Sequence, residues 1–112
     1  MIWVLFLICL VSCGPATMAD LRLEGEAQTK RLAEELQLIE SKEDLLSALP
    51  KLRKRFDQIA EILIKTRSFP KQDFQASFAS EQLFAELARL YEMPGCRELI
   101  EGAQADAIRR LN

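Results

Sequence analysis

Few residues of this 112-residue chain can do covalent chemistry, and histidine, the commonest general base, does not occur in it. Its absence excludes Ser-His-Asp and Cys-His arrangements and the usual histidine-containing zinc sites. Cys96 follows Pro94-Gly95 at an expected helix N-terminus, where the helix dipole favours a reactive thiolate. The alternative is a small buried apolar side chain, and we favour this interpretation. We therefore expect that the protein is not an enzyme.

Two sets of acidic residues have a spacing that suits paired-carboxylate or metal chemistry. They are the adjacent Glu34-Glu35 and the pair Glu98 and Glu101. On amphipathic helices such acids normally form the solvated face. We expect no catalytic residue, no metal site and no cofactor.

Cys13 ends an apolar segment that is typical of an export signal. Ile2 to Val11 form a run of about ten apolar residues, the length of a signal-peptide h-region and short of the roughly 20 that span a bilayer. Leu10-Val11-Ser12-Cys13 resembles the lipobox of bacterial lipoproteins. The n-region departs from the pattern, because Met1 stands alone without Lys or Arg. An uncleaved anchor and a buried N-terminal helix or strand are the alternatives.

The lipobox resemblance implies cleavage between Ser12 and Cys13 and a diacylglyceryl thioether on Cys13, with acyl chains such as palmitate. One acyl chain attaches a protein only marginally, whereas two or three make attachment effectively permanent. Gly14 stands where an Asp is the usual inner-membrane retention signal, which favours the periplasmic face of the outer membrane in a cell with two membranes. The tether from Gly14 to Ala19 has no charge and holds the domain within about 20 Å of the bilayer.

These features divide the chain into a signal peptide (1–12), a lipidated tether (13–19) and one domain (20–112). Cys9 is discarded and Cys13 is alkylated in this scheme, so Cys96 has no partner and the fold has no internal disulfide. The formal net charge of −2 is no nucleic-acid signature.

Helical spacing of apolar residues dominates the domain and predicts an all-α bundle of three to four helices. The first helix is expected from about Asp20, its N-cap, to Glu40, and a short helix to begin at Ser41 with a capping box to Asp44. We place Pro50 in the first turn of a new helix that runs to about Thr66. The expected core stripes are Leu32, Ala33, Leu36 and Ile39 in the first helix and Leu52, Phe56, Ile59 and Leu63 in the helix after Pro50.

In the second half of the domain, the residue pattern predicts a connection over 67–79 and then two further helices. Ser80 is the expected N-cap of one, and Met93-Pro94-Gly95 separates it from the last. Their apolar faces are Leu83, Phe84, Leu87, Leu90 and Tyr91, and then Leu99, Ile100, Ala103, Ala107, Ile108 and Leu111. Phe69, Phe74 and Phe78 either cover an open end of the bundle or form an exposed patch that contacts a partner.

This last hairpin weakly resembles one tetratricopeptide unit. Signature spacing is met by Phe84, Leu87, Ala88, Tyr91, Gly95 and Ala107. Ile100 and Gln104 depart from it, and no second repeat is visible, although such arrays need at least three. The resemblance implies a peptide-binding hairpin.

Charge lies in blocks, with an acidic first helix, a basic middle segment and an acidic end. We expect the oppositely charged helices to attract one another. Within the last helix, we expect Asp106 to form ion pairs with Arg109 and Arg110. The alternative is that Lys51, Lys54 and Arg55 share one helical face and contact anionic lipid headgroups.

Together these patterns predict a small membrane-anchored envelope lipoprotein that acts as a non-catalytic interaction or scaffold module. Its partners would be the membrane, reached through the lipid anchor, and an envelope protein, such as a component of a secretion or assembly system. A self-associating structural lipoprotein is the alternative, and the oligomeric state is left open.

Overall fold

The computed structural model describes residues 17–69 and 77–112, and every regular element in these two stretches is an α-helix. The helices are α2 (Met18–Gln37), α3 (Lys42–Thr66), α4 (Phe78–Tyr91) and α5 (Cys96–Leu111). The predicted all-α bundle is confirmed. Across the described residues no helix has both the length and the apolar character needed to cross a bilayer.

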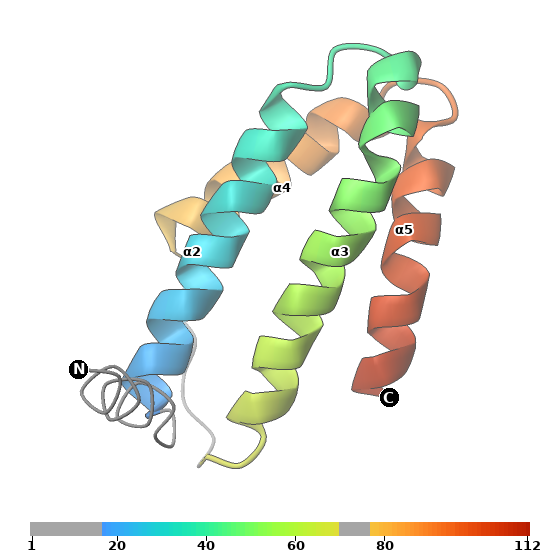
Figure 1. Ribbon diagram of the computed structural model, residues 1–112. Helices are drawn as coiled ribbons and strands as arrows, with labels where there is room; N and C mark the ends of the chain where they lie inside the picture. Colours follow the sequence, from blue (N-terminus) through green and yellow to red (C-terminus); the bar gives the residue numbers. More distant parts are fainter. Residues whose placement is uncertain (1–16, 70–76) are drawn as a thin grey trace, which may run out of the picture.

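The four helices pack as two hairpins laid against each other. Figure 1 shows α2 and α3 running antiparallel, α5 running beside α3 in the same direction, and α4 crossing behind α2. α2 packs on both α3 and α4, and α3 also packs on α5, whereas α4 and α5 contact each other least. Each helix of the second hairpin is therefore held mainly by a helix of the first.

A capping box starts α2 two residues earlier than the sequence predicted. The Thr17 hydroxyl accepts a hydrogen bond from the Asp20 amide at 3.1 Å, and the Asp20 carboxylate accepts one from the Thr17 amide at 3.3 Å. Asp20 is thus the N3 residue and not the N-cap. Met18 and Ala19, assigned above to the tether, already belong to the helix.

The prediction that Pro50 starts a new helix is wrong, because α3 continues through it from its N-cap Ser41. The Ser41 hydroxyl accepts from the Asp44 amide at 3.2 Å, as expected, but the Asp44 carboxylate accepts from the Glu40 amide at 3.0 Å. Leu45 and Leu52 lie two turns apart on either side of Pro50, and both are fully buried. An unbroken helix keeps both on the core face, which offsets the hydrogen bond lost at Pro50.

Ser77, and not Ser80, is the N-cap of α4. The Ser77 hydroxyl accepts from the Ser80 amide at 3.1 Å, and the Ser80 hydroxyl accepts from the Ser77 amide at 3.0 Å. Phe78 and Ala79 are therefore helical, although they were expected in the connection. The predicted turn before α5 is confirmed, and Gly95 adopts the left-handed conformation there, with φ of 82°.

The core lies where all four helices meet, and most of the predicted stripes contribute to it. The α2 stripe is buried throughout, as are Leu52 and Phe56 of α3 and Ile100, Ala103 and Ala107 of α5. Three predicted core residues are instead exposed: Leu63 at 42%, Phe84 at 68% and Ile108 at 50%. Near the end of α3 it is Ile62, the neighbour of Leu63, that is buried.

Arg89 of α4 closes the C-terminal end of α2. Its guanidinium donates to the carbonyl oxygens of Leu36 at 2.9 Å and Ile39 at 3.0 Å, and to the Glu86 carboxylate at 2.9 Å. Carbonyls in the last turn of a helix have no partner within the helix, and a cation there also suits the helix dipole. The Leu36 carbonyl also accepts from the Ile39 amide at 3.1 Å, so Arg89 adds a charged donor to it and joins α4 to the end of α2.

We expect Arg89→Ala to lower the free energy of unfolding by about 1 to 2 kcal/mol, because two carbonyls lose a charged donor. Urea denaturation followed by circular dichroism measures this change. Arg109→Ala is the matched control, since the pair of Arg109 with Asp106 is exposed and lies within one helix. Equal effects of the two substitutions would contradict the role given to Arg89.

Candidate functional site

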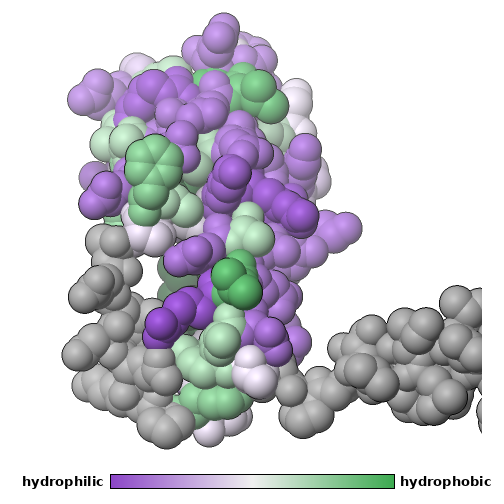
Figure 2. All heavy atoms as spheres, turned by 90° about the vertical axis from the view of Figure 1, so that its left-hand side faces the viewer, coloured by the Kyte–Doolittle hydropathy of each residue, from purple (hydrophilic) through white to green (hydrophobic). Residues whose placement is uncertain are grey.

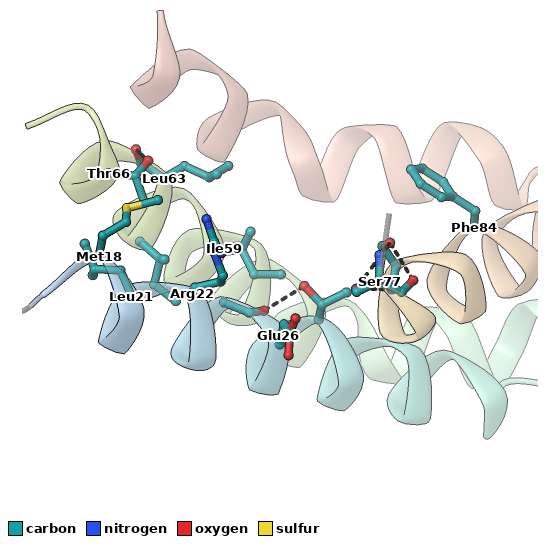
Figure 3. Close-up of a pocket in the computed structure, with 13 residues that line it drawn as sticks. Met18, Leu21, Arg22, Glu26, Ile59, Leu63, Thr66, Ser77 and Phe84 are labelled. Carbon is teal, nitrogen blue, oxygen red and sulfur yellow. Dashed lines mark hydrogen bonds between the residues drawn. The ribbon is translucent and has the colours of Figure 1, made fainter. Parts of the chain in front are cut away.

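A cleft of about 810 Å³ lies between the N-terminal half of α2, the C-terminal half of α3 and the start of α4. Figure 3 shows Met18, Leu21, Ile59 and Leu63 coming together from α2 and α3 at one end, and Ser77 and Phe84 of α4 at the other. Its volume is within the range of small-molecule sites, roughly 300 to 1,000 Å³.

Two of the apolar residues that line the cleft lie outside the main core cluster. Leu21 and Ile62 are both buried, yet neither belongs to the continuous core cluster. Gly25 lies one turn after Leu21 on α2, and a Cβ built on it would stand 3.8 Å from the Ile62 side chain, in ordinary contact. The missing side chain of Gly25 therefore adds open space to the cleft.

Most hydroxyl groups around the cleft are taken up by nearby backbone groups. Thr29 donates to the Gly25 carbonyl at 2.8 Å, and Thr66 donates to the Leu63 carbonyl at 2.6 Å. Ser77 and Ser80 form the capping box of α4. The charged residues Arg22 and Glu26 also line the cleft. Because the hydroxyls are engaged, the cleft presents mainly apolar surface to a ligand.

The structure describes two of the three phenylalanines predicted to contact a partner, and these two differ in exposure. Phe78 is 80% exposed and is not among the residues that line the cleft, Phe69 is half-buried, and Phe74 lies outside the described residues. On the face that carries α2 and α4, Figure 2 shows apolar residues at separate places among hydrophilic ones. Phe78 is thus an exposed aromatic side chain outside the cleft.

Phe84, like Leu63, lines the cleft although it was predicted to lie on the packed face of its helix. The face that packs on the core holds Leu83, Leu87 and Leu90, which recur at i, i+4 and i+7. Phe84 follows Leu83 directly, so it points about 100° away around the helix. The three leucines already form a complete packed face, and this pattern in the sequence could have indicated that Phe84 lies outside the core.

Arg55 does not share an exposed surface with Lys51 and Lys54, which corrects the predicted basic face. Its guanidinium pairs with the Glu35 carboxylate at 2.7 Å, and it also donates to the side-chain oxygens of Gln28 at 2.5 Å and Gln58 at 3.0 Å. The side chains of Arg55 and Glu35 are only 17% and 11% exposed. Arg55 therefore holds α3 to α2, and Lys51 and Lys54 are left on the surface.

The acidic residues considered for chemistry are not brought together. Glu34 is exposed while Glu35 pairs with Arg55, and Glu101 pairs with Arg97 within α5 at 2.9 Å. One oxygen of Glu35, Oε2, is buried without a hydrogen-bond partner. Within 17–69 and 77–112, no group of three or more Cys, Asp or Glu residues is placed to hold a metal ion.

Between α2 and α3 the ion pair has the expected sense, with the cation on α3. Between α3 and α5 the sense is opposite to the expected one, because the acidic residues are on α3. There the cation is Arg110 of α5, which pairs with Asp57 at 3.6 Å and with Glu61 of α3. The hydrogen bond to Glu61 raises the pKa of Arg110 above its ordinary value. The prediction that Arg110 pairs with Asp106 is wrong, whereas Arg109 does pair with Asp106.

Cys96 is fully buried in the core at the start of α5, as the favoured interpretation required. Near it in the chain, the guanidinium of Arg97 lies 5.4 Å from the centre of the Tyr91 ring. Burial, followed by the nearby carboxylate of Glu101, raises the pKa of Tyr91 above its ordinary value. The phenol of Tyr91 thus stays protonated at neutral pH.

Comparison of the chain with protein-family models, with curated proteins and with solved structures found no match. The function is therefore inferred from the geometry of the chain itself.

We expect Arg55→Ala to lower the free energy of unfolding by about 2 to 3 kcal/mol, because Glu35 is left half-buried without its cation. Lys54→Ala, one residue away on the surface, is the matched control and should change stability little. Urea denaturation of both variants measures the difference. If the two variants were equally stable, Arg55 would not be committed to the α2–α3 contact.

Alkylation of Cys96 by iodoacetamide should be about a hundredfold or more slower in the folded protein than in urea, because the thiol is reached only when the core opens. Mass spectrometry of the peptide that contains Cys96 gives both rates. Fast alkylation of the folded protein would contradict the burial of Cys96 and would reopen thiol chemistry at this position.

Proposed function

We propose that this protein is a small envelope lipoprotein, anchored through Cys13, that acts as a non-catalytic interaction or scaffold module. The observation that carries the proposal is the position of the apolar cleft, at the end of the bundle where α2 begins. Met18 and Thr66, the first residue of α2 and the last of α3, both line it. The side that would face the membrane is therefore the side that offers apolar surface.

The length of the spacer supports this arrangement. Cys13 precedes the N-cap Thr17 by a stretch that reaches about 14 Å when fully extended. A lipid on Cys13 would thus keep the open end of the cleft close to the bilayer. Two or three acyl chains would make this attachment effectively permanent.

Contact of Lys51 and Lys54 with lipid headgroups would need a different orientation. From Lys54 to Thr66, at the end nearest the anchor, is about 18 Å of helix. Headgroup contact through these lysines therefore requires the bundle to lie along the bilayer. If the bundle instead stands with its long axis across the membrane plane, the two lysines are held away from the headgroups. They are then available to an acidic surface of another protein.

The exposed apolar side chains are the best candidates for contact with an envelope partner. Phe78 of α4 is 80% exposed and lies outside the residues that line the cleft, so it is available to a partner whatever fills the cleft. Exposed aromatic and aliphatic side chains beside a concave apolar surface are typical of binding sites.

Intact-mass measurement of the protein from membranes of its native host tests the anchor. We expect a mature chain that begins at Cys13 and carries the added mass of several acyl groups. Cys13→Ala should lose this added mass, because the thioether cannot form. Cys96→Ala is the control and should keep it. An unmodified chain that retains Met1 would contradict the proposal.

A further inference from the structure

We propose that the cleft holds one acyl chain of the lipid carried on Cys13. The inference rests on the proposed lipidation and assigns the cleft an occupant that belongs to the same molecule. Its basis is the shape of the cleft, its apolar lining and its distance along the chain from Cys13.

The cleft has the form of a channel along α2. It is lined from Met18 to Thr29, which corresponds to about 16 Å of helix. Apolar side chains are spread along this length, which suits the methylene groups of an extended hydrocarbon chain, and the charged residues Arg22 and Glu26 line the same cleft. Leu21, Ile59, Ile62, Leu63 and Phe84 supply the apolar contacts.

The anchor can reach this channel without any rearrangement of α2. Cys13 precedes Met18, the residue at one end of the channel, by a stretch of at most about 18 Å. An acyl chain linked to Cys13 can therefore enter from the Met18 end and run toward Gly25. The effective concentration of a ligand tethered this closely is in the millimolar range or above.

Occupation of the cleft is compatible with membrane attachment. Stable attachment needs two acyl chains, so a cysteine that carries three can place one of them in the protein. An acyl chain in the cleft remains shielded from water on an apolar surface, as it would be in the bilayer. The same chain would cover Leu63 and Phe84, the two cleft residues that are 42% and 68% exposed.

The test is to grow the native host with a fatty acid that carries a diazirine, purify the full-length lipidated protein and activate the probe with light. Mass spectrometry then maps the cross-links. We expect cross-links from the lipid of Cys13 to residues 18–29 and 59–66 of the same molecule.

Gly25→Leu should reduce these cross-links about tenfold, because the new side chain occupies the channel. Gly102→Leu is the matched control, since Gly102 is a helical glycine with open space around it on α5. Leu63→Glu serves as a second variant at a residue that is already exposed, with Ile108→Glu as its control. Circular dichroism confirms that each variant is folded.

The outcomes separate the two proposals. If Cys13 carries the probe but cross-links fall only on membrane lipids, on other parts of the chain or on a second copy, the cleft is not the site and the anchor still stands. Cross-links that persist unchanged in both Gly25→Leu and Leu63→Glu would also overturn the inference. If Cys13 carries no probe at all, lipidation itself fails and the inference fails with it.

Discussion

The structure depends on one constraint, which is that α3 must pack on α2 and α5 at the same time. Its apolar residues Leu45, Leu52 and Phe56 enter the common core. On one side Arg55 pairs with Glu35 of α2, and on another Glu61 pairs with Arg110 of α5. Because α3 contacts α2 on one side and α5 on another, it has to continue as one helix to keep both contacts. This is why α3 runs through Pro50 rather than ending there.

The cleft follows from the unequal lengths of the helices. α3 has 25 residues and α2 has 20, but α4 has only 14. α4 is fixed at the C-terminal end of α2 by Arg89, so it is too short to cover the N-terminal half of α2 as well. Leu21 and Ile62 are buried there outside the main core cluster. The open surface is therefore a result of helix length and not of a gap in the apolar pattern.

Helical periodicity was enough to predict the fold class and most of the core, because stripes such as Leu32, Leu36 and Ile39 have one possible buried face. It was not enough to place helix boundaries at Thr17 and Ser77, where a second capping residue three positions later looked equally suitable. Periodicity also could not separate Ile62 from Leu63 at the cleft, because that choice depends on how far α4 extends over α2. Arg55 was misplaced for a similar reason, since its partner lies on another helix.

The weak contact between α4 and α5 bears on how the chain folds. Neither helix of the second hairpin buries its apolar face on the other, so that hairpin has no core of its own. It can become ordered only on the surface of an α2–α3 pair that is already formed or is forming at the same time. The α2–α3 contacts, which are close in sequence, therefore form first. The packing of α4 on α2 and of α5 on α3 follows, an order that loop-closure entropy also favours. The chain thus behaves as one cooperative unit in which the N-terminal half is the template for the C-terminal half.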